Sequence, residues 1–528
     1  MAYLAEKRDH APEGSWVWFL AAISLLLAVA AFVMQRRGIS TSPDGIVYTS
    51  VASNLARGRG LSVPFTIYTD HYTPSQSIAF DYQVPLRQWP PLWPAVLSLL
   101  VRLGASGETA TRILNPALLG VNVFLAGVFT RRVFRRSWAV LFTALLTVVL
   151  IRDPSFASSS LLYLHVTTLA EPLFLCFVLS TLIFLDRFLA SRALVWLVGA
   201  AAAASLATLT KVLGLSVVAV VCIVAGLCAG PWLLRLGRMT LCAAIGLTPV
   251  LPTLVHASSR TTGPTRNEMT DIVFTELRLG LLEMAPPSVG PNWIRWTFVG
   301  AVLIVSMALA ALAWRRPECR QGMLALGPTA ALSTVLVAQL VLSRSFVDRY
   351  VPLIGRPLSL VQLLAATVVL GLLSLSGDSG QVRKRSVFTL AVISTLTIAT
   401  AGLPLFHAVV DPPYIKNSHA ILSSTTATAV GAKDLFSNAP DYLIATTGDP
   451  SYLVPCRIDY YGGAIRPEFT DEMDQLVQLV QEGSANVLLV GGRLGAAADC
   501  ASTSDFDGRP GLTIRQLDRD TALVTSTG

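Results

Sequence analysis

The chain alternates between long apolar segments and short polar loops, most of them basic. Each apolar segment is close to the roughly 20 residues that an α-helix needs to cross a bilayer. About eleven spanning helices are therefore predicted, at 16–34, 112–130, 137–151, 167–185, 193–210, 213–234, 239–256, 295–314, 321–342, 352–375 and 386–408. The pattern predicts an all-α polytopic membrane protein over residues 1–408.

One further apolar stretch, 91–103, does not fit a spanning helix. It is short, begins at a pair of prolines and is flanked by Trp89 and Trp93. Tryptophan is enriched where a membrane meets water, so we predict a juxtamembrane helix here. The two tryptophans are expected to be interface anchors, with sugar stacking as the alternative.

The tail, residues 409–528, is more polar and changes its periodicity. Residues 442–447 and 486–492 are strand-like, and 513–527 alternate between apolar and polar positions. An amphipathic helix is expected at 471–482. We predict a small α/β domain at the C-terminus.

The charge pattern predicts the topology. The net charge is +8, but the basic residues are scattered among the short loops, which is a topology signal and not a nucleic-acid site. Basic loops lie inside, which places the N-terminus in the cytoplasm and leaves the loop 35–111 and the tail outside the membrane. Within an extracytoplasmic tail, Cys456 and Cys500 either form a disulfide or stay unpaired.

Three acidic residues are candidates for catalysis. Asp44 lies in the first outer loop beside the membrane, where a general base for an acceptor hydroxyl would be needed. The sequence Ser42-Pro43-Asp44 is also a helix-start signal, so capping is the alternative. Asp153 and Glu171 lie at the outer edges of predicted spans, where an acidic group is either functional or a helix-start carboxylate.

Two basic residues are candidates for binding a phosphate. Lys211 interrupts the apolar sequence where two predicted spans meet on the outer side. It either offers a point charge to a phosphate or extends to the interface. Arg349 lies on an outer loop, against the positive-inside trend, which a lipid phosphate or diphosphate would explain. A surface pair with Asp348 is the alternative.

A divalent metal is a further possibility in the first loop, at His71 with Asp70, Tyr72 and Asp81. Their spacing matches no established metal pattern, so metal use stays open.

Several short motifs occur in a characteristic order, and they are listed here from the N-terminus. They are Asp44-Gly-x-x-Tyr48, Asn54-Leu-Ala-x-Gly58-x-Gly60, Trp89-Pro-Pro-Leu-Trp93-Pro94, Glu171-Pro-Leu173, Leu209-Thr-Lys211-x-x-Gly214, Arg349-Tyr350-x-Pro352, Phe436-Ser-Asn-Ala-Pro-Asp441 and Leu453-Val-Pro455. This ordered set resembles the GT-C superfamily of integral-membrane glycosyltransferases. It is most similar to bacterial relatives of the protein O-mannosyltransferases and of the aminoarabinose transferase that modifies lipid A.

The resemblance implies a GT-C-like enzyme of a bacterial plasma membrane that inverts the sugar's configuration. A polyprenyl-phosphate-linked sugar would be the donor and a lipid, glycan or protein the acceptor. Asp44 matches the family's first-loop base, with Glu171 or Asp153 as the second acidic residue and Lys211 and Arg349 on the donor phosphate. Tyr48, His71, Trp89 and Tyr350 are further substrate-site candidates. Many relatives carry two adjacent acidic residues in this loop, whereas this chain has Pro43-Asp44.

Three other functions compete with this interpretation. An O-antigen ligase or polymerase would use a diphosphate-linked donor, but such enzymes rely on a large late loop and here the first loop is the largest. A lipid or sugar transporter would be expected to show internal repeats, and none is apparent. A non-catalytic sugar- or lipid-binding scaffold is the third.

Overall fold

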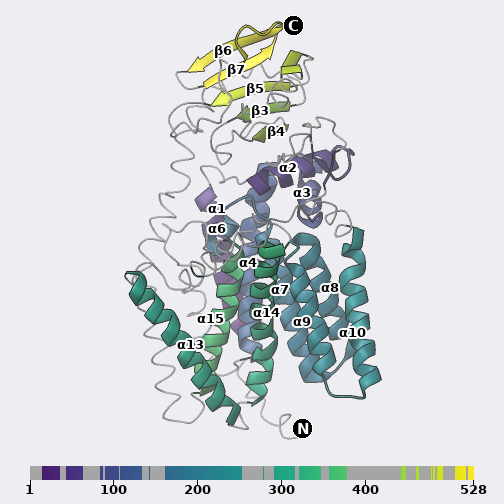
Figure 1. Ribbon diagram of the computed structural model, residues 1–528, viewed down its shortest axis with the longest axis vertical. Helices are drawn as coiled ribbons and strands as arrows, with labels where there is room; N and C mark the ends of the chain where they lie inside the picture. Colours follow the sequence, from purple (N-terminus) through teal and green to yellow (C-terminus); the bar gives the residue numbers. More distant parts are fainter. Residues whose placement is uncertain are drawn as a thin grey trace.

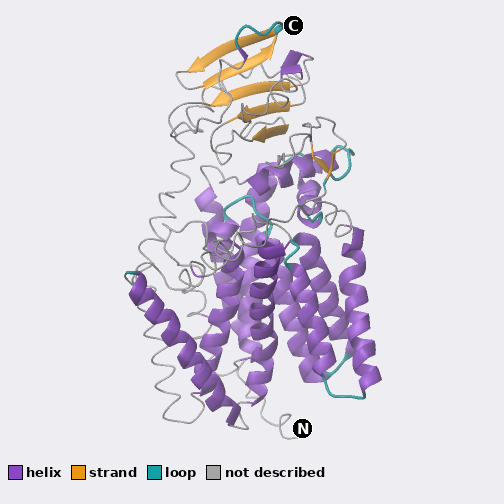
Figure 2. Ribbon diagram, viewed as in Figure 1, coloured by secondary structure: helices purple, strands orange, loops and turns teal. Residues whose placement is uncertain are grey.

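The computed structural model describes residues 15–35, 43–63, 84–86, 90–105, 107–133, 142, 161–252, 278, 291–315, 320–346, 356–376, 442–446, 459–462, 477–478, 480–481, 485–490, 506–518 and 521–527. In these ranges a bundle of long helices carries shorter helices and a β-sheet at one end (Figure 1). The bundle is helical, and most of the strands lie in the sheet near the C-terminus (Figure 2).

The bundle is built from long apolar helices. They are α1 (Ser15–Met34), α4 (Gly107–Val133), α7 (Glu171–Ser191), α8 (Leu194–Thr210), α9 (Gly214–Leu227), α10 (Trp232–Leu247), α13 (Asn292–Arg315), α14 (Arg320–Phe346) and α15 (Arg356–Ser376). Six helices within the described ranges are long and apolar enough to cross a membrane. The prediction of a mostly helical membrane protein is confirmed. Of the predicted span 137–151 the structure describes residue 142 alone, and the predicted span 386–408 lies outside the described residues.

One predicted span, 213–234, is divided in the structure. Helix α9 ends before Gly230, and α10 begins directly after Pro231. Gly230 has a φ of 145°, and proline lacks an amide hydrogen, so this pair interrupts the helix. Arg235 and Arg238 were expected in a loop and instead lie inside α10.

At one end of the bundle, basic side chains of α4 contact the ends of neighbouring helices. The Arg131 guanidinium, in the last turn of α4, lies 4.3 Å from the centroid of the Trp16 ring at the start of α1. Arg132 Nε lies 2.7 Å from Asp186 Oδ2, near the end of α7. Helix α4 therefore runs antiparallel to α1 and parallel to α7, as the charge pattern predicted.

The first loop forms its own structure at the opposite end of the bundle (Figure 1). It contains α2 (Pro43–Ala56), the two-stranded pair of β1 (Ser62–Val63) and β2 (Val84–Pro85), and α3 (Leu92–Arg102). With 11 residues, α3 is about 16 Å long and too short to span a bilayer. Its length agrees with the juxtamembrane helix predicted here.

The turn that follows α2 explains the motif Asn54-Leu-Ala-x-Gly58-x-Gly60. Gly58 and Gly60 have φ values of 79° and 76°, in the left-handed region that favours glycine. The buried side chain of Asn54 donates from Nδ2 to the carbonyl oxygen of Ser62, at 3.0 Å. The asparagine and two glycines thus turn the chain from α2 into β1.

The tail contributes a five-stranded mixed sheet in the order β4-β3-β5-β7-β6. Its strands are β3 (Tyr442–Thr446), β4 (Asp459–Gly462), β5 (Ala485–Val490), β6 (Leu512–Asp518) and β7 (Thr521–Ser526). Strand β3 is parallel to β4 and β5, and β7 is antiparallel to β5 and β6. The strands predicted near 442 and 486 are confirmed, while the domain boundary at 409 stays a prediction. The edge strand β4 contacts α2.

Candidate active site at the end of the bundle

The first turn of α2 lies directly on the segment between α6 (Leu161–His165) and α7. A Cβ built on Gly45 would overlap Thr168 Oγ1 and would lie 2.5 Å from the Thr168 carbonyl oxygen. Only glycine allows so close an approach. Asp44 precedes Gly45 in the same turn, one residue after α2 begins at Pro43. The predicted first-loop aspartate therefore belongs to a helix that rests on the α6–α7 connection.

The buried face of α2 also packs against α3 and the start of α7. Tyr48 and Ala52 pack in one cluster with Trp93 of α3 and with Ala170 and Leu173 at the start of α7. Tyr48 is 3% exposed, so the structure places this substrate-site candidate in the packing between α2 and α7. Trp93 is fully buried, which corrects its interpretation as an interface anchor.

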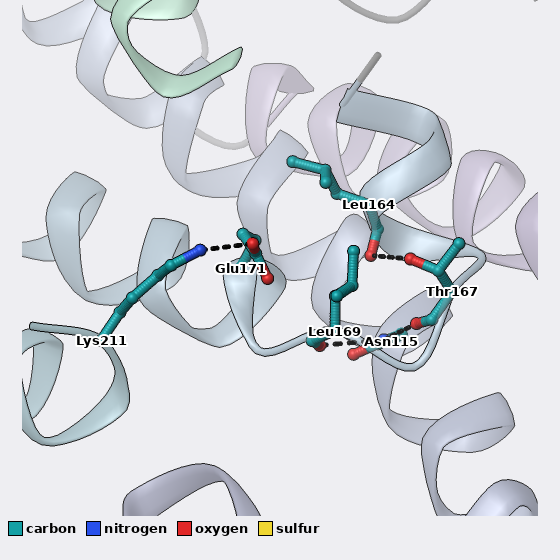
Figure 3. Close-up of polar contacts among 6 residues, drawn as sticks. All are labelled: Asn115, Leu164, Thr167, Leu169, Glu171 and Lys211. Atoms are coloured by element: carbon teal, nitrogen blue, oxygen red, sulfur yellow. Dashed lines mark hydrogen bonds and ion pairs between the residues drawn. The ribbon is translucent and has the colours of Figure 1, made fainter. Parts of the chain in front are cut away.

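Glu171 and Lys211 form an ion pair (Figure 3). Glu171 is the first residue of α7, where the positive end of the helix dipole favours a carboxylate. Lys211 follows the last residue of α8 and caps it. The side chain of Glu171 is 9% exposed and that of Lys211 is 24% exposed. Because an ammonium carries three hydrogens, this pair leaves Lys211 capacity for a second anion.

The turn that carries Lys211 is fixed by two contacts. A Cβ on Gly214 would lie 2.5 Å from the carbonyl carbon of Ala207, so the turn folds tightly back on α8. Gln339 of α14 accepts from the Ser216 backbone amide at 3.1 Å and donates to the Val212 carbonyl oxygen at 3.1 Å. The spacing between Lys211 and Gly214 in the motif is therefore a requirement of this turn.

Sequence reasoning missed four polar residues around the site: Asn115, Asn122, His165 and Gln339. They lie within or beside apolar segments, where a polar side chain that bonds across helices is the available signal. The seven-residue spacing of Asn115 and Asn122 puts them on one face of α4. The spacing of Asn115 and Asn122 is therefore a signal that could have predicted that pair.

Several predicted site residues lie outside the described ranges. They are His71, with Asp70, Tyr72 and Asp81, and also Trp89, Asp153, Arg349, Tyr350, Cys456 and Cys500. Within the described part of the chain, no group of three or more metal-ligating side chains comes together. The structure thus brings together the turn of Asp44 with Glu171 and Lys211.

No protein-family model and no curated protein matches the chain. A search of solved structures finds similarity to the archaeal oligosaccharyltransferase AglB from Archaeoglobus fulgidus, solved in complex with an inhibitory peptide and a dolichol-phosphate. The alignment has a TM-score of 0.45 and 12% sequence identity, and it covers 90% of this chain and 70% of AglB. Similarity at this level carries no conclusion about the activity of this chain.

Proposed function

We propose that the protein is an inverting glycosyltransferase that moves a sugar from a polyprenyl-phosphate carrier to an acceptor on the outer face of a membrane. One observation carries the proposal. The turn of α2 that contains Asp44 rests on Thr168, three residues before the Glu171–Lys211 ion pair. The helical turn that carries Asp44 therefore lies close in the fold to an acidic residue and a cation from two other segments, at one end of an apolar bundle where a lipid-linked donor would be bound.

In the proposed reaction Asp44 acts as the general base. Its carboxylate takes the proton from the acceptor hydroxyl as that oxygen attacks the anomeric carbon from the side opposite the phosphate. A new bond forms between the anomeric carbon and the acceptor oxygen, and the bond from that carbon to the phosphate oxygen breaks. The electron pair leaves with the phosphate. Attack from the opposite side inverts the configuration of the sugar.

Lys211 would stabilise the leaving group. The polyprenyl phosphate gains one negative charge when the glycosidic bond breaks, and a cation placed beforehand lowers the barrier for that step. Glu171 would orient the Lys211 ammonium through their ion pair. Arg349 is proposed as a second ligand of the phosphate, with Asp153 as an alternative acidic residue.

The tail is proposed to help select the acceptor. Strand β4 is the edge of the C-terminal sheet and contacts α2, the helix that carries Asp44. An acceptor approaching Asp44 would therefore pass beside this edge strand. The basic end of the bundle, with Arg131 and Arg132, lies at the far ends of α4 and α7 from Glu171. The positive-inside rule would then place the site on the outer face of a bacterial plasma membrane.

The experiment uses purified protein in nanodiscs with a panel of polyprenyl-phosphate sugars and candidate acceptors. Release of free polyprenyl phosphate is measured for the wild type, for Asp44→Asn and for the matched control Asp507→Asn, an exposed position in the tail. We expect turnover of one donor, lowered about 10²- to 10⁴-fold by Asp44→Asn and unchanged by the control. Full activity of Asp44→Asn would exclude Asp44 as the base. Binding without turnover of any donor would favour a scaffold.

A further inference from the structure

The α6–α7 connection, residues 166–170, is irregular backbone buried at the end of a membrane bundle. All five residues are buried, as are His165 before them and Glu171 after them. Backbone groups outside a helix have no water to bond to in such a place, so the protein must supply partners. The connection and the residue after it provide both contacts that define the candidate site, Thr168 beneath Gly45 and Glu171 beside Lys211.

One asparagine of α4 supplies such partners, and a second bonds to the residues on either side of the connection. Asn115 Nδ2 donates to the carbonyl oxygens of Thr167, at 2.5 Å, and Leu169, at 3.3 Å (Figure 3). Asn122 Nδ2 donates to the carbonyl oxygen of Pro172, at 2.9 Å. The oxygens Oδ1 of both asparagines meet no donor within the described ranges. Asn115 therefore donates hydrogen bonds to the segment itself, and Asn122 donates to the start of α7 that follows it.

Asn122 also contacts a buried histidine. Its Nδ2 lies 2.9 Å from His165 Nε2. The Pro172 carbonyl can only accept, so the amide must present its hydrogens to both neighbours. Nε2 of His165 is then placed to accept from this amide. On the other side, Gln35 at the end of α1 donates to the His165 carbonyl oxygen at 3.0 Å.

We propose that Asn115 and Asn122 are positioning residues for the transfer reaction, holding the connection so that Glu171 meets Lys211 and Thr168 supports the turn of Asp44. This inference rests on the proposed function for its catalytic part. Its structural part, that the asparagines position the ion pair, stands independently. The two parts are tested by separate measurements.

The kinetic test uses Asn115→Leu and Asn115→Asp. The leucine variant removes both hydrogen bonds, and we expect kcat to fall about 10²-fold, as for a reacting group displaced by about 1 Å. In Asn115→Asp an ionised carboxyl group has no hydrogen to donate to the two carbonyl oxygens. A protonated carboxyl group can donate a hydrogen bond to one of these oxygens. Its rate relative to wild type should therefore rise as pH falls, while the ratio for Asn115→Leu stays flat. Asn292→Asp, at an exposed position, is the matched control.

The structural test needs no activity. Thermal unfolding is followed for Asn115→Leu, Lys211→Met and the double variant. If Asn115 positions Glu171, the loss of Tm caused by Lys211→Met is smaller in the Asn115→Leu background. Additive losses overturn the positioning role, as does a wild-type kcat in Asn115→Leu. A wild type inactive on every donor, with non-additive Tm losses, would refute the transfer reaction and leave the positioning intact.

Discussion

Replacing Gly45 by alanine tests whether the first turn of α2 must stay against the α6–α7 connection. The new methyl group would overlap Thr168 Oγ1 and lie 2.5 Å from the Thr168 carbonyl oxygen, whereas ordinary contact begins at 3.4 Å. The turn must therefore retreat by about 0.9 Å, and Asp44 moves with it. A displacement of about 1 Å at a reacting group costs roughly 10²-fold in rate. We expect kcat to fall by about that factor.

Stability should change far less than activity in this variant. Alanine gains up to about 1 kcal/mol over glycine in a helix, and overpacking costs about 1–3 kcal/mol, so the two largely offset each other. Release of polyprenyl phosphate and thermal unfolding are measured together, with Gly327→Ala on α14, where a Cβ meets nothing within 4 Å, as the control. Adding Thr168→Gly should not restore the rate, because the carbonyl oxygen remains. A wild-type kcat for Gly45→Ala would refute the reasoning.

Two further predictions concern the charged residues. Lys211→Met leaves the nearly buried Glu171 carboxylate without its cation, and we expect a loss of about 2–4 kcal/mol in stability, since two charges 4 Å apart interact by about 4 kcal/mol in such surroundings. Adding Glu171→Gln should recover most of the lost Tm, and a double variant as unstable as the single one would contradict the pairing. Arg349→Ala is expected to weaken binding of the donor more than of the acceptor, measured by titration of each. Equal donor affinity in variant and wild type would remove Arg349 from the phosphate site.

The sequence predicted a mostly helical membrane protein because a long apolar run in a bilayer has one stable solution. Every backbone group must be paired within the segment, which a helix alone achieves for a single span. The start of α7 could not be predicted in the same way. Residues 167–170 were included in the predicted span 167–185, but they form the irregular connection. Their composition is compatible with a helix, and the hydrogen bonds that favour the other conformation come from Asn115, far away in the sequence.

The candidate site was predicted residue by residue, but not as an arrangement. Glu171 and Lys211 were assigned separate roles, because nothing in a sequence shows that positions 40 apart will form an ion pair. Tyr48 was predicted as a substrate-site residue and Trp93 as an interface anchor, because aromatic side chains near a membrane usually lie at the interface. Their burial depends on α2 and α3 folding over the start of α7, which is a tertiary contact.

The asparagines of α4 also have a consequence for how the protein is made. The carbonyl groups that they bond to lie 52 and 50 positions later in the chain, at Thr167 and Pro172. When α4 first leaves the ribosome, these side chains have no partners, and an unsatisfied polar group in hydrocarbon costs several kcal/mol. We expect nascent α4 to remain beside the insertion machinery until α7 emerges. Assembly of the site would then coincide with release of the N-terminal half into lipid, and chains broken between the two helices would be exposed to quality-control proteases.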